Sequence, residues 1–244
     1  MAYARKGLRI KKRSFKKVTR KVATRSAGIS KGTKALVSLI KKVALKPVET
    51  KNTHFIEENI QLYHNVPQIV YDNLNTTQAI TENDSGLSNF ACRVGDKVIA
   101  RGLSYKFWFA NKLDRPNVMY KIIFYKYRSN TVPTAPFHSQ GTSNYMIRDL
   151  DVEKYKIIKV VNFNLQTSAQ KLVTGDTFGG AEGHRAVSVW IPMNNQQITY
   201  ENGTQYPRLI DIAYTVVCYD SYGTLLTDNI ASYAVNRKFY FKDP

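Results

Sequence analysis

Apolar and polar residues alternate along most of the chain after residue 49, with a period of two. This alternation is typical of β-strands that bury one face. Six segments show it clearly, a seventh is an almost continuous apolar run, and two short segments compete for the place of an eighth strand. The strands are predicted around 56–62, 99–109, 118–127, 155–165, 187–193, 210–218 and 233–241, with 69–71 and 197–200 as the short candidates.

Two of the predicted strands carry more detailed expectations. In the first strand, Ile56, Ile60 and Leu62 are expected to share one face. Residues 118–127 are instead an almost continuous apolar run, which favours a strand covered on both faces. No helical pattern longer than about two turns interrupts the chain after residue 49. We therefore predict that this part of the chain is all-β.

The connections between these strands are unusually long for a β domain. Three of them, 78–95, 129–150 and 168–183, are rich in Asn, Ser, Thr, Gly and Pro. Connections of this length usually carry function or form interfaces. Up-and-down barrels favour tight hairpins, so the long connections favour two packed sheets instead. The predicted fold is an eight-stranded double-sheet jelly roll.

Charge divides the chain at residue 48. Residues 1–48 hold 16 Lys or Arg and no Asp or Glu, whereas the remaining 196 residues hold 20 basic and 18 acidic side chains. The net charge of +18 therefore splits into +16 and +2. A block of one sign repels itself and has too little apolar surface to offset the entropy of ordering. We expect residues 1–48 to be a disordered basic arm that binds a polyanion, and residues 49–244 to be the folded domain.

Eleven of the basic residues lie between positions 5 and 25, and we predict that they bind the phosphates of nucleic acid. They are Arg5, Lys6, Arg9, Lys11, Lys12, Arg13, Lys16, Lys17, Arg20, Lys21 and Arg25. Five of them, Lys11-Lys12-Arg13 with Lys16-Lys17, also form a predicted nuclear localisation signal. The alternative is a tail that only keeps the protein soluble, but solubility does not require a block of a single sign.

The end of the arm has a different pattern. Four apolar residues recur there at helical spacing, with lysines on the other side: Leu36, Leu39, Ile40 and Val43. Pro47 would end such a helix. A basic amphipathic helix of this kind lies on a membrane surface or packs beneath a protein shell. The alternative is a marginal helix that forms only when the arm is engaged.

The residues that usually carry catalysis or bind metals are sparse. The four histidines, His54, His64, His138 and His184, show no metal-binding spacing, and no nucleophile elbow or phosphate loop occurs. Three acids on one side of an extended segment, Asp149, Asp151 and Glu153, are a candidate divalent-cation site, with an ordinary polar loop as the alternative. Cys92 and Cys218 are interpreted as small buried hydrophobes or an incidental pair. We expect no enzymatic activity and no cofactor.

Signals for targeting and recruitment are equally limited. No apolar run reaches membrane-spanning length, and residues 1–20 lack the apolar stretch of a signal peptide, so we expect the protein to stay inside the cell. Pro133-Thr134-Ala135-Pro136 resembles the budding motif that recruits the ESCRT machinery, although four residues in a proline-bearing loop also match by chance.

The arrangement resembles the capsid proteins of small circular single-stranded DNA viruses, the circovirus-like or CRESS-DNA group. The resemblance covers the whole chain as an architecture: a polybasic N-terminus, a jelly roll with long loops and a final β-strand. Three stretches are similar to theirs, namely Arg93-Val94-Gly95-Asp96-Lys97, the run of residues 151–159, and Phe239-Tyr240-Phe241-Lys242-Asp243-Pro244. The arm differs in using many Lys where circovirus arms are dominated by Arg.

The resemblance implies a viral capsid protein that self-associates into a small icosahedral shell and packages a single-stranded genome, DNA being favoured over RNA. The arms of about 60 copies would carry on the order of a thousand positive charges, which would neutralise much of a genome of about one to two kilobases. The implied locations are the virion and the host nucleus, reached through the nuclear import machinery. Neither the host, the receptor nor the triangulation of the shell is indicated.

Three alternatives remain at this stage. One is the capsid of a satellite-type RNA virus. Another is a non-viral nucleic-acid-binding β protein, which should carry a basic groove studded with aromatic residues. Its best candidate is the segment where Lys121, Lys126 and Arg128 alternate with tyrosines: Tyr120, Tyr125 and Tyr127. The third is a carbohydrate-binding or hydrolytic jelly roll with an incidental tail.

Overall fold

Eight β-strands account for most of the described residues after position 48. The structure is a computed structural model, and it describes residues 49–74, 93, 95–112, 114–139, 143–166, 183–201, 204–220, 225–226 and 228–243, together with Leu36, Leu39, Ile40 and Val43. The chain divides into two units, Met1–Val48 and Glu49–Pro244. The strands are β1 (Thr50–Tyr63), β2 (Gln68–Val70), β3 (Lys97–Asn111), β4 (Asn117–Arg128), β5 (Lys156–Gln166), β6 (His184–Thr199), β7 (Ile210–Asp220) and β8 (Asn229–Lys242).

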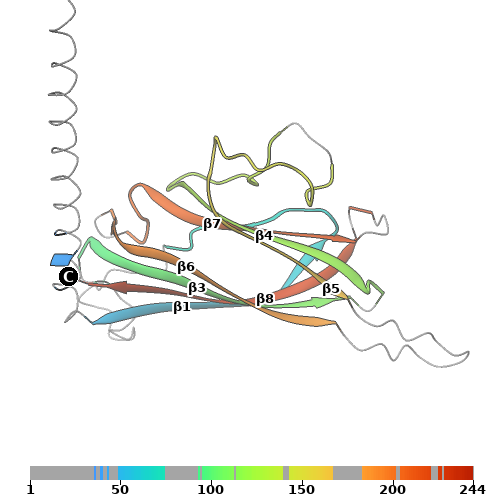
Figure 1. The fold of residues 1–244 in the computed structure, drawn as a ribbon, viewed down its shortest axis with the longest axis horizontal. Coiled ribbons are helices and arrows are strands. Elements are labelled where there is room, and N and C mark those ends of the chain that lie inside the picture. The colour runs from blue at the N-terminus through green and yellow to red at the C-terminus, as the bar shows by residue number, and fades with distance from the viewer. Residues whose placement is uncertain are drawn as a thin grey trace, which may run out of the picture. The chain divides into compact units, whose positions relative to one another are not determined.

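The strands form two antiparallel four-stranded sheets that face each other (Figure 1). The first sheet has the order β1-β8-β3-β6, and the second sheet has the order β2-β7-β4-β5. The pairing follows a simple rule, in which the numbers of the two partners add up to nine. β1 pairs with β8, β2 with β7, β3 with β6, and β4 with β5. The predicted all-β class with two packed sheets is therefore confirmed as a double-sheet β-sandwich.

The predicted strands correspond closely to the observed ones. Six of the seven clear predictions fall inside observed strands, and the seventh, 155–165, begins one residue before β5. The short candidate 69–71 overlaps β2 and supplies the eighth strand in the described part of the chain. The other candidate, 197–200, is not a separate strand, because its first three residues end the long strand β6.

Aromatic side chains from both sheets fill the core of the sandwich. Alternate residues of β3 point inward, so that Tyr105 and Phe107 are buried. Their rings meet rings of the second sheet, with centroid separations of 4.9 Å from Tyr105 to Phe124 and 5.5 Å from Phe107 to Tyr214. Burial of such large apolar groups is the main term that stabilises the sandwich.

A second cluster covers the opposite face of the second sheet. Ile123 and Tyr125 of β4 point away from the sandwich core and are buried against Phe137 and its neighbours. The prediction that 118–127 is covered on both faces is therefore confirmed. The described residues of the long connection 129–150 supply apolar side chains that cover β4 and β7. The segment passes over these two strands in Figure 1.

The first strand corrects one expectation about sequence periodicity. Ile56 is 54% exposed, whereas Leu62 is buried. The pairing of β1 with β8 shifts register between Glu57 and Ile60, and Asn59 adopts a left-handed backbone with φ of 57°. The bulge adds a residue to one strand and so reverses which residues face inward. Ile56 and Leu62 therefore lie on opposite faces.

The predicted amphipathic helix in the arm is seen at four positions. Leu36, Leu39, Ile40 and Val43 are helical, and each is more than half exposed. No helix among the described residues has the length and apolar character needed to cross a membrane.

Asp211 at the start of β7 is a buried carboxylate whose protonation should affect stability. Its Oδ1 atom accepts the backbone N–H of Leu74 at 3.0 Å and that of Ile212 at 2.5 Å. Burial raises the pKa of Asp211 to about 7. A folded-state pKa above the unfolded value means that the stabilising contribution is complete below about pH 4 and is lost as the pH rises towards 7.

We therefore expect the free energy of unfolding to fall as the pH is raised from 5 to 8, and Asp211→Asn to remove that part of the slope. Between pH 5 and 8, the upper limit of the effect is about 3 kcal/mol. Urea denaturation of both proteins at several pH values measures it. Buried His64 has a lowered pKa, which changes stability with pH in the opposite direction. Its contribution cancels when the free energy of unfolding of one protein is subtracted from that of the other at each pH. Parallel pH curves would show that Asp211 does not take up a proton on folding.

Candidate nucleic-acid interface

The predicted phosphate-binding residues of the arm lie outside the described residues. This holds for all eleven positions from Arg5 to Arg25, including the five-residue localisation signal. The surfaces that the structure does describe belong to the sandwich, and each sequence-derived candidate there is located below.

The acidic candidate does not form a cation site. Asp151 Oδ1 accepts the backbone N–H of Lys154 at 2.9 Å, which closes a turn before β5. Within the described ranges, no group of three or more His, Cys, Asp or Glu side chains is arranged to hold a metal ion. Asp149, Asp151 and Glu153 therefore correspond to the polar-loop alternative.

The described histidine and cysteine with buried side chains are structural. Nδ1 of His64 accepts the backbone N–H of Asp220 at 3.1 Å, and desolvation lowers the pKa of this histidine. Cys218 is buried, as expected, and burial raises the pKa of its thiol to about 12. A thiol with so high a pKa is a poor nucleophile at neutral pH. Cys92 lies outside the described residues.

The Pro133-Thr134-Ala135-Pro136 segment is fastened to the fold. Both prolines are buried. The Thr134 N–H donates to the hydroxyl of Tyr155 at 2.9 Å, and the Tyr125 hydroxyl donates to the Thr134 carbonyl at 3.3 Å. A recruiting protein would have to detach the segment before it could bind it as an extended peptide.

The basic and aromatic run in β4 is not a binding groove. The rings of Tyr120, Tyr125 and Tyr127 are buried. Lys121 is also buried, and its Nζ donates to the carbonyl oxygen of Met146 at 3.1 Å. Burial lowers the pKa of this lysine. Four of the six candidate residues are therefore buried, whereas Lys126 is half-buried and Arg128 is exposed at the end of β4.

Arg93 in the Arg93-Val94-Gly95-Asp96-Lys97 motif has a structural role. Its buried guanidinium donates to the carbonyl oxygens of Gly95 and Thr204, lies 3.3 Å from an Asp96 carboxylate oxygen and stacks 4.4 Å from the Tyr200 ring centre. These contacts join the turn before β3 to the segment after β6. Gly95 has φ of 82°, a left-handed conformation that glycine adopts without strain.

A cavity of about 500 Å³ lies beside β4 and β5. Side-chain amides dominate its polar lining, with contributions from Asn117, Asn162, Asn164 and Gln166. Met146 from the covering segment also lines it. Among the described residues, no Lys or Arg lines the cavity, so it lacks the cations that would bind a phosphate.

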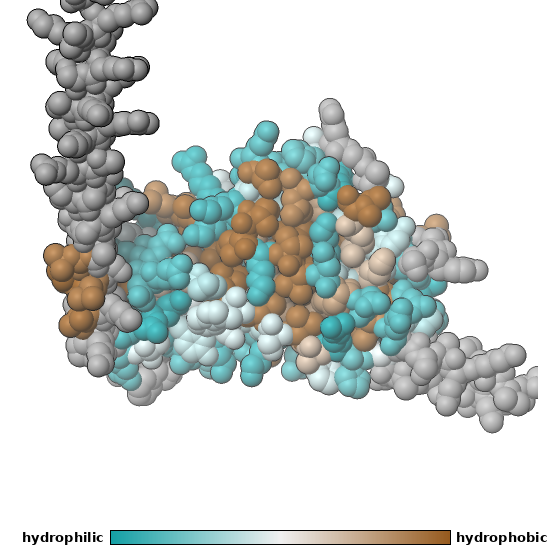
Figure 2. Space-filling model, viewed as in Figure 1, coloured by the Kyte–Doolittle hydropathy of each residue, from teal (hydrophilic) through white to brown (hydrophobic). Residues whose placement is uncertain are grey.

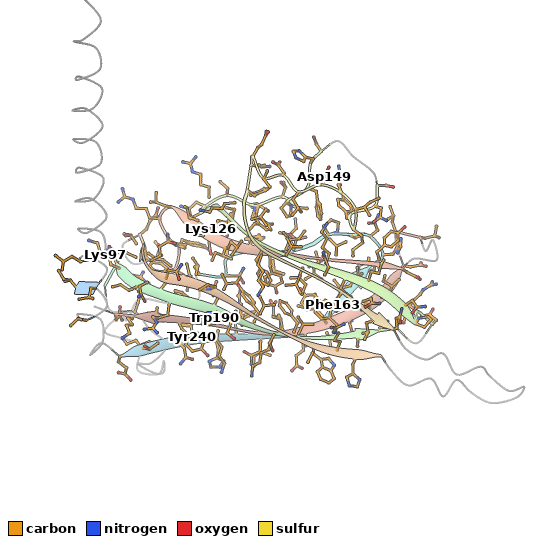
Figure 3. The ribbon with its side chains drawn as sticks, viewed as in Figure 1. Lys97, Lys126, Asp149, Phe163, Trp190 and Tyr240 are labelled. Atoms are coloured by element: carbon orange, nitrogen blue, oxygen red, sulfur yellow. The ribbon has the colours of Figure 1, made fainter. Side chains whose placement is uncertain are left out.

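The surface with the richest chemistry is the side of the first sheet that points away from the second sheet, here called the outer face. It consists of the residues that alternate with the core positions. Its central members are Gly102, Ser104, Lys106 and Trp108 of β3, His184, Ser188 and Trp190 of β6, and Asn236, Lys238 and Tyr240 of β8. Figure 3 shows Trp190 and Tyr240 together on this sheet.

Two pairs of rings stand on the outer face. The rings of Trp190 and Tyr240 are 5.7 Å apart and tilted by 58°. Those of Trp108 and His184 are 4.6 Å apart and nearly parallel, at 11°. Trp108 remains 50% exposed and Trp190 45% exposed. Half-exposed indoles are unusual, because tryptophan is highly buried on average.

The charge of this sheet is strongly one-sided. The three strands β3, β6 and β8 contain seven Lys or Arg and no Asp or Glu. The residues after position 48 carry a net +2, so these strands contribute +7 and the rest of that part contributes −5. On β1 the acids Glu57 and Glu58 border a hollow shared with β2.

Sequence reasoning missed the outer face because it averaged charge over residues 49–244. The signal was present in two forms. The alternation that places Tyr105 and Phe107 in the core also places Lys106 and Trp108 on the opposite face. Separate charge counts for each predicted strand would have shown that 99–109, 187–193 and 233–241 are acid-free, as are 118–127 and 155–165.

The comparisons with known proteins add no family to this description. No protein-family model matches the chain, and no curated protein matches it.

Proposed function

We propose that this protein is the capsid protein of a virus with a small single-stranded genome. Residues 49–244 associate into a closed shell, and the basic arm binds the genome inside it. The observation that carries the proposal is the charge division: +16 without a single acid in residues 1–48, ahead of a sandwich with a net charge of +2. A polyanion such as a phosphate backbone is the natural partner of that arm.

The strand pairing supports the finer assignment of the sandwich as a jelly roll. The first strand pairs with the last, the second with the seventh, and so on inward to β4 with β5. This order is expected when one long antiparallel hairpin is rolled over on itself. This rolling produces two Greek keys in an eight-stranded double sheet. Shells and lectin-like modules both use this architecture, so the fold alone does not select the function.

Apolar residues in the connections support self-association. Val132, Ile147 and Leu209 are each at least 70% exposed, and all three lie outside the strands. Figure 2 shows apolar side chains reaching the viewed surface between hydrophilic ones. Covering such side chains with a partner is favourable, because apolar surface is then removed from water. Under the proposal, the partners are neighbouring copies in the shell.

The second candidate function is a non-viral protein that binds single-stranded nucleic acid. One observation favours it, namely the acid-free basic strands with exposed indoles on the first sheet. The two candidates differ in their assembly state, because only the capsid protein must form closed particles of defined size.

Particle formation tests the proposal directly. The full chain should form closed particles that protect single-stranded nucleic acid from nuclease, as seen by electron microscopy and sedimentation. A chain that begins at Glu49 should still form particles but package little nucleic acid, because the contacts between copies come from the sandwich. A monodisperse monomer from the full chain under all assembly conditions would favour the second candidate. If the full chain formed particles and the chain that begins at Glu49 did not, the arm would have to supply the contacts between copies.

A further inference from the structure

We propose that the outer face of the first sheet is a second nucleic-acid contact, where unpaired bases stack on Trp190 and Trp108 while Lys106 and Lys238 bind backbone phosphates. The inference rests on the proposed function, because it names the part of the sandwich that holds the same single-stranded genome. It differs from that function in its chemistry, since the arm recognises charge alone and this face also recognises bases.

The first argument is the availability of the rings. Base–aromatic stacking needs a π-face that solvent can reach, and about half of each indole is exposed. An indole left half exposed on a sheet loses much of the stabilisation that burial would give. The chain contains only two tryptophans, and both are on this face.

Gly102 sets the position of Trp190. A Cβ atom placed on Gly102 would lie only 2.4 Å from Cζ2 and 2.6 Å from Cη2 of the indole. The ring therefore lies across β3 at a point where a side chain would displace it. Tyr240 is the register partner of Gly102 on β8, and its ring meets Trp190 from the other side. The fold itself thus arranges rings contributed by β6 and β8, which lowers the cost of binding.

The lysines lie between the two aromatic pairs. Lys238, Ser104 and Trp190 occupy one row across β8, β3 and β6, because both pairings share Ser104. Lys106 occupies the next row and is two residues from Trp108 on the same strand. The six steps from Gly102 to Trp108 along β3 span roughly 20 Å. Among the described residues, neither lysine forms an ion pair with a carboxylate.

A single strand fits this face better than a duplex does. The bases of a duplex are stacked on one another and cannot reach rings on a flat sheet, whereas those of a single strand can be splayed out. Sequence preference should be weak, because every base has a π-face. The hydroxyl and amide groups of Ser104, Ser188 and Asn236 can hydrogen-bond phosphates or base edges but provide no fixed code.

A second copy of the chain is the other conceivable occupant. Two observations disfavour it. The centres of protein interfaces are depleted in lysine, whereas two lysines sit among the rings here. Lys106 and Lys238 also make this face electropositive, so a polyanion complements it better than an identical face would.

Tryptophan fluorescence of the full chain tests the inference without any mutation. The arm has no tryptophan, so quenching reports on the outer face alone. Oligothymidine should quench the fluorescence in a saturable manner. A duplex of equal length and heparin should bind but leave the fluorescence unchanged. Binding itself is followed by the anisotropy of a label on each polyanion.

Variants then test the named side chains at 0.5 M salt, where the arm's contribution is weakened. Trp190→Ala should reduce the affinity for oligothymidine at least about fivefold, the lower limit for one stacked base. Tyr206→Ala, which removes an exposed ring outside the strands, should change it less than about twofold. Lys106→Ala with Lys238→Ala should weaken binding more than Lys156→Ala with Lys159→Ala, a matched loss of two charges on β5.

The outcomes separate this inference from the proposed function. Oligothymidine that binds without quenching, while the full chain still forms particles, overturns the inference and leaves the capsid proposal intact. Quenching that follows protein concentration without nucleic acid also overturns it, because the face would then be an interface between copies. Saturable quenching by single strands supports the inference even if no particles form, in which case the capsid proposal fails alone.

Discussion

A peptide of residues 1–48 is expected to lose on the order of 10³- to 10⁵-fold in affinity for single-stranded DNA when salt is raised from 50 to 200 mM. Each phosphate neutralised by Lys or Arg releases condensed counterions, and salt opposes that release. At about 0.7 per contact for single strands, such a loss implies about seven to twelve contacts, and the 16 basic residues of the peptide are enough to make them. Fluorescence anisotropy over a series of salt concentrations measures the slope.

Two matched peptides sharpen this prediction. A shuffled peptide of the same composition should give the same slope, because phosphate contacts carry no sequence information. Replacing Lys11, Lys12, Arg13, Lys16 and Lys17 by Ala should reduce the slope of log affinity against log salt by about 3.5, at 0.7 per lost contact. A flat salt response, or strong preference for one DNA sequence, would contradict a purely electrostatic arm.

One alanine inserted between Met119 and Tyr120 of β4 is expected to abolish soluble protein. The insertion reverses the faces of the following strand residues, so Lys121 would turn from the carbonyls of Tyr145 and Met146 into the aromatic core between the sheets. Burying an unpaired ammonium costs several kcal/mol, which is comparable to the whole stability of a domain. The soluble fraction and the near-ultraviolet circular dichroism measure the outcome.

The control is the same insertion between residues 141 and 142. The flanking residues are anchored, since the Ser139 carbonyl accepts from Arg148 and the Ser143 carbonyl accepts from Asn65, each at 2.7 Å. An insertion between these anchors leaves both in place and should be tolerated. We expect the same at residues 179–180, which lie outside the described residues. A soluble β4 variant together with a collapsed loop variant would mean that the strand assignment is wrong.

The long connection 129–150 is partly buried in the structure. The sequence of 129–150 is polar enough to predict an exposed connection. Phe137, Tyr145 and Leu150 nevertheless pack on β4 and β7. A few apolar residues in a polar segment give no periodic signal, so their burial could not be recognised before the sheet beneath them was known.

The outer face, too, is predictable from the sequence only in part. Alternation along β3 indicates that Lys106 and Trp108 share a face. That Lys238 of β8 and Trp190 of β6 join them depends on the strand order, because these residues come from segments far apart in the chain. Gly102 gives no sign in the sequence that an indole crosses it.

The sequence by itself determined the properties that local pattern and composition carry. These are the position of nearly every strand, the double coverage of 118–127 and the division of charge at residue 48. Only the tertiary structure decided which way Ile56 points, where Lys121 is buried and which strands assemble the outer face. The reason is physical: side-chain direction follows from period two within a strand, but bulges, strand order and covering segments are set by long-range contacts that no short window contains.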